Sequence, residues 1–253
     1  VLPLQNIETA LWLESDRMLS LAFTEKSLET QRSVVIEEFK QRYLNQPYGD
    51  VWLELRPLAY KTHPYNWATI GKKLEHIEDA KMEDVKSFFK RFYAPNNAVL
   101  CVAGDFELEQ VKSLCSKWFE GIPAVEMPEK NIPKEEKQTE FRELTIEREV
   151  PTDAFYYAFK MVDRLSPDYF VTDIISDALG GDKSSRLYNS IKKELKLVNS
   201  ISAYITGSVD EGLFLISGKL APGKTFEELD EANRESEKDF QDRQKRLAAA
   251  GAQ

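Results

Sequence analysis

The sequence predicts an α+β fold divided into two parts. Segments with the periodicity of strands are mixed with segments of helical periodicity, and the two do not alternate regularly as they do in a doubly wound sheet. A stretch at 121–139 holds three prolines among charged residues and separates two regions of apolar periodicity. Hydrophobic residues make up 42% of the 253 residues and aromatic residues 11%, which is enough for a folded core.

The first region opens with amphipathic helices. Leu11–Phe23 and Lys26–Tyr43 carry apolar side chains at helical spacing. Met82–Phe92 has them at intervals of 3, 4 and 3 residues and ends before Pro95. The short apolar run Ala98–Ala103 predicts a buried strand.

Gly104 and Asp105 end that predicted strand. Asp105 is a candidate N-cap for a helix with apolar residues at helical spacing. These are Leu108, Val111, Leu114 and Trp118. Cys101 in the strand and Cys115 on the helix are predicted to be buried residues and not a redox pair.

Beyond the proline-rich stretch the pattern starts again. Glu140–Glu149 and Ala154–Met161 have the composition of strands. Ser166 is a predicted N-cap, with Pro167 at the first helical position. The helix that follows closes at Gly180-Gly181.

Two further elements are predicted in this second region. Ser184–Glu194 has helical spacing, and Ser200–Ile205 pairs with Gly212–Lys219 as a β-hairpin. The tail 235–253 is charged and then alanine-rich, and no role is assigned to it.

Composition excludes several functional classes. The chain has 34 Lys+Arg against 43 Asp+Glu, a formal charge of −9 at pH 7, which argues against a nucleic-acid partner. No apolar run approaches the roughly 18 residues that a membrane-spanning helix needs. Phosphate loops, nucleophile elbows and paired metal-binding histidines are all missing from the sequence. The two histidines, His63 and His76, are expected in a loop and at the surface.

Several motifs occur in a fixed order along the chain. They are LQNIETALWLESDRM at 4–18, LETQRSVVIEE at 28–38, HPY at 63–65 with IG at 70–71, YAPNNA at 93–98, AGDF at 103–106, LGG at 179–181 and SSRLY at 184–188. In this order and spacing they resemble the pitrilysin/insulinase family of zinc metallopeptidases, the inverzincins. The resemblance covers about residues 1–232.

This resemblance implies two related α/β sandwich domains, with mostly antiparallel sheets packed against helices around an enclosed chamber. It implies residues 1–120 as the C-terminal part of a first repeat, 121–139 as a linker and 140–234 as the start of a second repeat. It also implies a zinc ion held by two histidines of an HxxEH helix and a later glutamate, with the HxxEH glutamate as general base. No HxxEH occurs here, and it is expected further upstream of Glu29 than the 28 residues that precede it. Truncation before Val1 explains this most economically, and a divergent non-peptidase member is the alternative.

One metal ligand is carried over from the family pattern. It falls on Glu29, three residues before the Arg-x-Val-Val segment, near the edge of the buried face of its helix. Without the resemblance, a lone glutamate on a helix is more often a solvated charge. Glu25 and Glu37 lie on roughly the same helix face and are the alternatives.

A weaker carry-over concerns substrate contacts. Many family members place an arginine and, seven residues later, a tyrosine in the second repeat. Lys192 and Asn199 stand at the matching positions. Compared with arginine, lysine keeps the positive charge but lacks the planar guanidinium group. Compared with tyrosine, asparagine keeps a hydrogen-bond donor on a shorter side chain. Lys192 as an ordinary surface charge is the competing interpretation.

Three functional hypotheses follow. The first is a zinc metalloendopeptidase that cleaves peptides or unfolded segments, of which this chain alone is an inactive fragment. The second is a non-catalytic member that serves as a structural or partner subunit, paired with itself as a homodimer or with another family subunit. The third is an acidic binding module, which the ordered motifs disfavour.

Overall fold

The computed structural model describes residues 2–232 and 234. The chain forms two compact units, Val1–Leu144 and Thr145–Gln253. The tail 235–253, to which the sequence assigned no role, lies outside the described residues.

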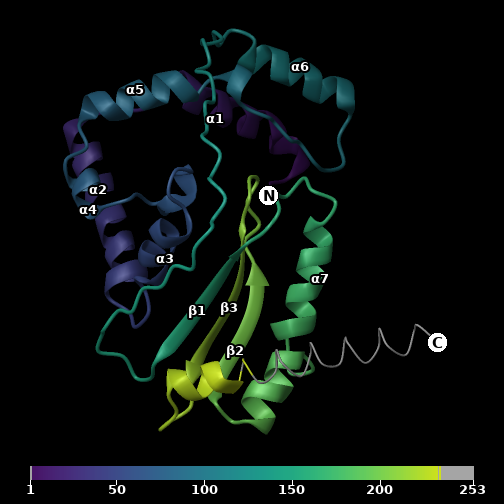
Figure 1. Cartoon of the computed structure of the whole chain (residues 1–253). Helices are drawn as coiled ribbons and strands as arrows, with labels where there is room; N and C mark the ends of the chain where they lie inside the picture. Colours follow the sequence, from purple (N-terminus) through teal and green to yellow (C-terminus); the bar gives the residue numbers. More distant parts are fainter. Residues whose placement is uncertain (1, 233, 235–253) are drawn as a thin grey trace. The chain divides into compact units, whose positions relative to one another are not determined.

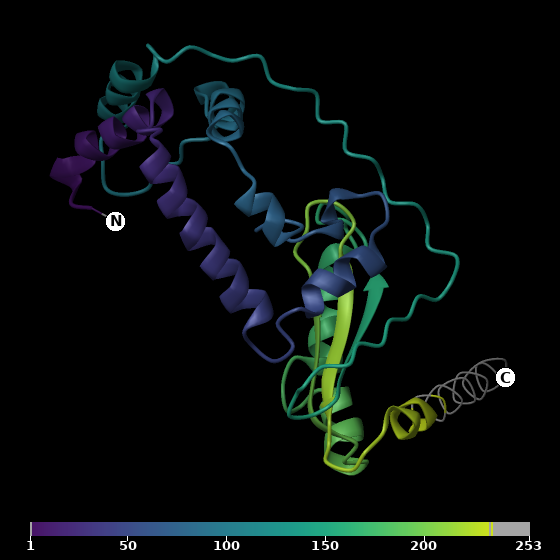
Figure 2. The ribbon, with the colours of Figure 1, turned by 90° about the vertical axis from the view of Figure 1, so that its left-hand side faces the viewer.

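The first unit is helical. Its helices are α1 (Ile7–Leu19), α2 (Glu25–Phe39), α3 (Val51–Ala59), α4 (Leu74–Glu78), α5 (Met82–Phe92) and α6 (Leu108–Phe119). Helix α1 packs against α6, and α2 packs against α4. Figure 2 shows α2 as one long rod, which a short π-helical turn, η2 (Lys40–Leu44), extends. Short 3-10 turns occur at Leu4–Asn6, Pro64–Asn66 and Pro95–Asn97.

The helices predicted in this unit are confirmed, most of them with shifted ends. Helix α5 has the bounds that the apolar spacing predicted, because its apolar face and the following Pro95 mark both ends. Helix α1 ends at Leu19, short of Phe23. The prediction of Asp105 as an N-cap is wrong, since α6 begins at Leu108 with Glu107 at its N-cap.

The predicted strand Ala98–Ala103 is absent, and this prediction is wrong. Val99 is 90% exposed, and Cys101 is exposed, not buried. Cys115 on α6 is half-buried. A strand needs a neighbour to pair its backbone groups, and among residues 2–144 the structure has only an isolated bridge between Ala68 and Gly71.

The second unit is a three-stranded antiparallel sheet with one long helix. The strands are β1 (Ala154–Lys160), β2 (Val198–Ile205) and β3 (Leu213–Leu220), in the order β1–β3–β2 (Figure 1). The predicted hairpin is therefore confirmed, and β3 lies at the centre of the sheet. Glu140–Glu149, also predicted as a strand, has no regular structure.

Helix α7 (Tyr169–Gly180) packs against β2. It begins two residues later than the sequence predicted, with Asp168 at the N-cap, because the Ser166 hydroxyl accepts the Asp168 N–H in the preceding turn at 3.3 Å. Its end at Gly180-Gly181 is confirmed. The predicted helix Ser184–Glu194 is largely a π-helical segment, η5 (Tyr188–Glu194).

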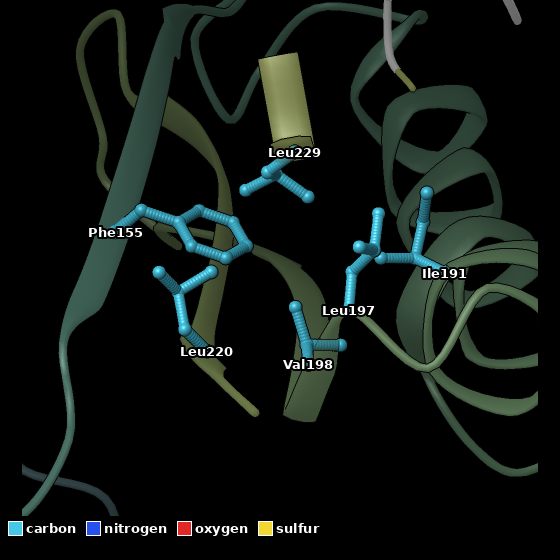
Figure 3. Close-up of a cluster of buried hydrophobic side chains, with 6 residues drawn as sticks. All are labelled: Phe155, Ile191, Leu197, Val198, Leu220 and Leu229. Carbon is cyan, nitrogen blue, oxygen red and sulfur yellow. The ribbon is translucent and has the colours of Figure 1, made fainter. Parts of the chain in front are cut away.

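The core of this unit lies between the sheet, η5 and the helical residues 226–232. Figure 3 shows side chains that converge from these elements, and all are less than 9% exposed. They are Phe155, Ile191, Leu197, Val198, Leu220 and Leu229. An α+β fold is therefore confirmed. No described helix is both long enough and apolar enough to cross a membrane.

Candidate functional site

Helix α2 carries the residues that the sequence marked for metal binding. A capping box fixes its first turn: the Thr24 hydroxyl accepts the Ser27 N–H at 3.1 Å, and the Ser27 hydroxyl accepts the Thr24 N–H at 3.0 Å. At the other end Phe39 is 3% exposed and anchors the helix in the unit. The carboxylates between these two ends are therefore displayed on a well-defined helix.

Glu29 lies on α2 with its side chain 66% exposed. Its carboxylate pairs with the guanidinium of Arg32, one turn further along. Arg32 is mostly buried and also donates to the carbonyl oxygen of Ala80, just before α5. This arrangement holds Glu29 near the turn between α4 and α5, at the edge of the packed face of α2.

Two more glutamates lie on the second half of α2. Glu37 pairs with Lys40 at 3.0 Å, and Glu38 pairs with Arg42 at 2.9 Å. Both line a shallow, open hollow on the helix surface. Its lining residues are Ser33, Val34, Glu37, Glu38 and Gln41. Glu29 is not among them, and Glu38 was not considered as a candidate from the sequence.

The described residues do not form a complete metal centre. In the part of the chain that the structure describes, no three His, Cys, Asp or Glu side chains come together in a way that could hold a metal ion. His63 is only 5% exposed, and its Nδ1 accepts the Tyr65 N–H at 3.1 Å. This histidine caps a turn, and His76 is exposed on α4. A zinc site in a protein needs at least three such ligands, so the carboxylates of α2 would not hold zinc by themselves.

The two candidate substrate contacts lie in the second unit. Lys192 belongs to η5 and places its Nζ 5.0 Å from the centre of the Tyr188 ring, a cation–π contact. Asn199 is exposed in β2, at the irregularity where the register with β3 shifts between Val198 and Ser200. Segment η5 packs against β2. A residue in a bulge re-aims its side chain relative to a regular strand, so Asn199 is displayed outward.

Glu135, which the sequence did not indicate as a site residue, has a strongly lowered side-chain pKa. Burial acts to raise the pKa of Glu135, but hydrogen bonds from His63, Lys61 and Thr62 outweigh it and lower this pKa to about 2. Glu135 lies in the proline-rich stretch 121–139. It is one of several charged residues there, and nothing in the sequence distinguishes it from the others. Only the fold brings residue 135 to residues 61–63.

Comparison with known proteins gives the family. Residues 79–251 match the family model described as "Peptidase M16 inactive domain". The chain is 30% identical over 215 residues to "Zinc protease PqqE" of Helicobacter pylori, a match that covers 83% of this chain and 48% of that protein. It is also 24% identical over 200 residues to "Non-peptidase homolog YmxG" of the same organism, over 78% of this chain and 45% of that protein.

A solved structure shows the same fold. The crystal structure of a protease from Helicobacter pylori superposes with a TM-score of 0.82 at 28% identity and covers 93% of this chain and 57% of that one. The chain thus spans about half the length of the curated relatives it matches. The ordered motifs and the comparisons agree: the chain belongs to the M16 peptidase family, the pitrilysin/insulinase group of zinc metallopeptidases.

Proposed function

We propose that this chain is part of a zinc metalloendopeptidase that hydrolyses peptides or unfolded segments. The observation that carries this proposal is the match to a named zinc protease over 83% of the chain. Because the match covers only 48% of that protein, the activity belongs to a longer polypeptide than the one described here. Bound zinc would polarise the peptide carbonyl and lower the pKa of its water towards neutrality.

The chain's own contribution is a carboxylate on α2. The family pattern implies Glu29, whose carboxylate pairs with Arg32 one turn further along the same helix. Glu25 and Glu37 are the alternatives on roughly the same helix face. Glu37 also lines the hollow on the second half of α2, together with Glu38. The histidines and the general base would come from an HxxEH segment outside this chain.

Lys192 and Asn199 are proposed as substrate contacts. Lys192 offers a positive charge and Asn199 a side-chain donor, both of which suit a peptide carbonyl oxygen. Their support is the family spacing, together with the outward display of Asn199 in β2. Both residues depart from the family's arginine and tyrosine, so we expect weaker substrate binding than in members that keep that pair.

The test compares three variants of the complete gene product. Glu29→Gln, Glu37→Gln and Glu38→Gln each keep the side-chain shape and remove the charge. One of the three should lose zinc on dialysis and lose peptide hydrolysis. Its zinc affinity should fall by more than about 100-fold, because replacing even a residue that only hydrogen-bonds to a metal ligand lowers metal affinity by about 10–100-fold. The other two should keep most of the metal. If all three retain zinc and activity, none of these three carboxylates is the ligand.

A second candidate function is a non-catalytic subunit that pairs with another copy or with an active family member. The match to a protein named as a non-peptidase homologue favours this possibility, as do the departures at Lys192 and Asn199. It predicts a complete gene product that binds no zinc and instead forms a stable complex. Metal analysis of that product separates the two proposals.

A further inference from the structure

The stretch between the two regular regions is fastened to the first unit along its length. We call residues 121–142 the strap. Figure 1 draws it as an extended segment without helix or strand. Near its start, the Asn96 side chain donates to the Val125 carbonyl oxygen at 2.8 Å and accepts the Val125 N–H at 3.2 Å. The amide of Asn96 therefore pairs with the strap as a neighbouring strand would.

Glu135 makes the second attachment. Its carboxylate accepts the backbone N–H groups of Lys61, Thr62 and His63 at 2.7, 2.9 and 2.9 Å. The Thr62 hydroxyl also lies 3.1 Å from this carboxylate and 3.1 Å from the Lys134 carbonyl oxygen. Successive N–H groups that point to one anion form a strong site, since each bond is charge-assisted.

Arg142 makes the third attachment. Its Nη1 donates to the carbonyl oxygens of Leu58 and Ala59 at 3.0 and 3.4 Å. These carbonyls belong to the last turn of α3, where carbonyl groups have no partner within the helix. The strap thus caps the C-terminal end of α3 and binds the loop that follows it.

The second unit begins shortly after the last of these attachments. Leu220 in β3 donates its N–H to the carbonyl oxygen of Asp153 at 2.9 Å. The two units divide between residues 144 and 145, so the strap belongs to the first unit. Residues 143–152 are what remains between the anchor at Arg142 and the sheet.

We propose that the strap shortens the flexible connection between the two units. Its attachments to the first unit leave only residues 143–152 free to act as the connection. At about 3.3–3.6 Å per residue, those residues reach roughly 35 Å. Residues 126–152, which would be free without the Glu135 and Arg142 attachments, reach roughly 95 Å. Release of Glu135 and Arg142 would let the units separate much further. The strap therefore limits how far the two units can separate, independently of any metal or catalytic role.

The test measures the distance between the units by double electron–electron resonance. Spin labels are placed at two exposed helical positions outside the strap, and the native cysteines are removed. The substitutions are Lys90→Cys, Lys193→Cys, Cys101→Ser and Cys115→Ser. The double variant Glu135→Ala/Arg142→Ala should broaden the distance distribution and add a population at longer distances. Identical distributions in both proteins would overturn the proposal.

Trypsin gives an independent measurement. Lys134 and Lys137 flank Glu135 and are exposed. A protease must bind several consecutive residues of the strap around the cleaved bond, and the Glu135 attachment restrains these residues. Loss of the Glu135 hydrogen bonds should speed this cleavage about tenfold or more, because cleavage follows the population of the released strap. Glu136→Ala is the matched control, since Glu136 is exposed and next in sequence. Equal cleavage rates in the Glu135→Ala and Glu136→Ala proteins would also overturn it.

Discussion

Two glutamates of this chain, Glu135 and Glu29, differ in the partners that the fold gives their carboxylates. Glu135 and Glu29 both occur in charged surroundings in the sequence. Glu135 is held by three backbone N–H groups, whereas Glu29 pairs with one arginine in its own helix. The family pattern could mark Glu29, but nothing local could mark Glu135, because its partners are more than 70 residues away.

The Glu135 contacts make the first unit's stability depend on pH. Folding lowers this pKa from the ordinary 4.5 to about 2, so the ionised carboxylate stabilises the folded state above pH 4.5. This contribution declines as the pH falls from 4.5 towards 2. Glu135→Ala should lower the free energy of unfolding at pH 7 by about 1–2 kcal/mol, a value reduced for partial exposure.

Urea denaturation of parent and Glu135→Ala proteins at pH 7, 4 and 2.5 checks this expectation. The difference in unfolding free energy should be largest at pH 7 and shrink at each lower pH. Glu136→Ala should show almost no difference at any pH. A difference for Glu135→Ala that is the same at all three pH values would contradict the ionic origin of the stabilisation.

At the scale of elements, the sequence predicted helices better than strands. Met82–Phe92 was predictable because a helix satisfies its own backbone and needs only a local apolar face. Ala98–Ala103 has strand composition, yet it is irregular and exposed, because strand formation depends on a partner that local sequence does not encode. The hairpin was predictable because β2 and β3 follow one another in the sequence. The position of β3 between β1 and β2 was not predictable.

Packing between α7 and the sheet gives a prediction for one glycine. A Cβ at Gly180 would lie 2.1 Å from the Ala203 backbone nitrogen and 2.8 Å from the Ala203 Cβ. Because α7 would have to move off β2, Gly180→Ala should cost about 3 kcal/mol or more. Thermal unfolding followed by circular dichroism measures this loss.

Gly121→Ala is the matched control, since a Cβ there meets nothing within 4 Å. It should change the stability by less than about 0.5 kcal/mol. Equal melting temperatures for the Gly180→Ala and Gly121→Ala proteins would mean that α7 does not pack this closely on β2.

At the scale of the whole molecule, family membership was predictable and the metal centre was not. Motifs at seven places occur in one order along the chain, and the family that they indicated is the one that the family model and the relatives match. A metal centre needs several ligands in one place, and the described residues bring no such group together. The assignment of residues 1–120 and 140–234 to two related repeats stays a proposal, as do the roles of Glu29, Lys192 and Asn199.

As proposed above, this chain supplies part of a zinc peptidase, and its described residues hold no complete metal site. Calorimetric titration with zinc, beside hydrolysis of an unfolded peptide, tests it most directly for this chain and for the complete gene product. We predict one zinc per complete gene product with chelator-sensitive hydrolysis, and neither zinc binding nor hydrolysis for this chain alone, because one remaining carboxylate cannot make a three-ligand site. A full equivalent of zinc and peptide cleavage by this chain alone would contradict the account, and so would a complete gene product that binds no zinc.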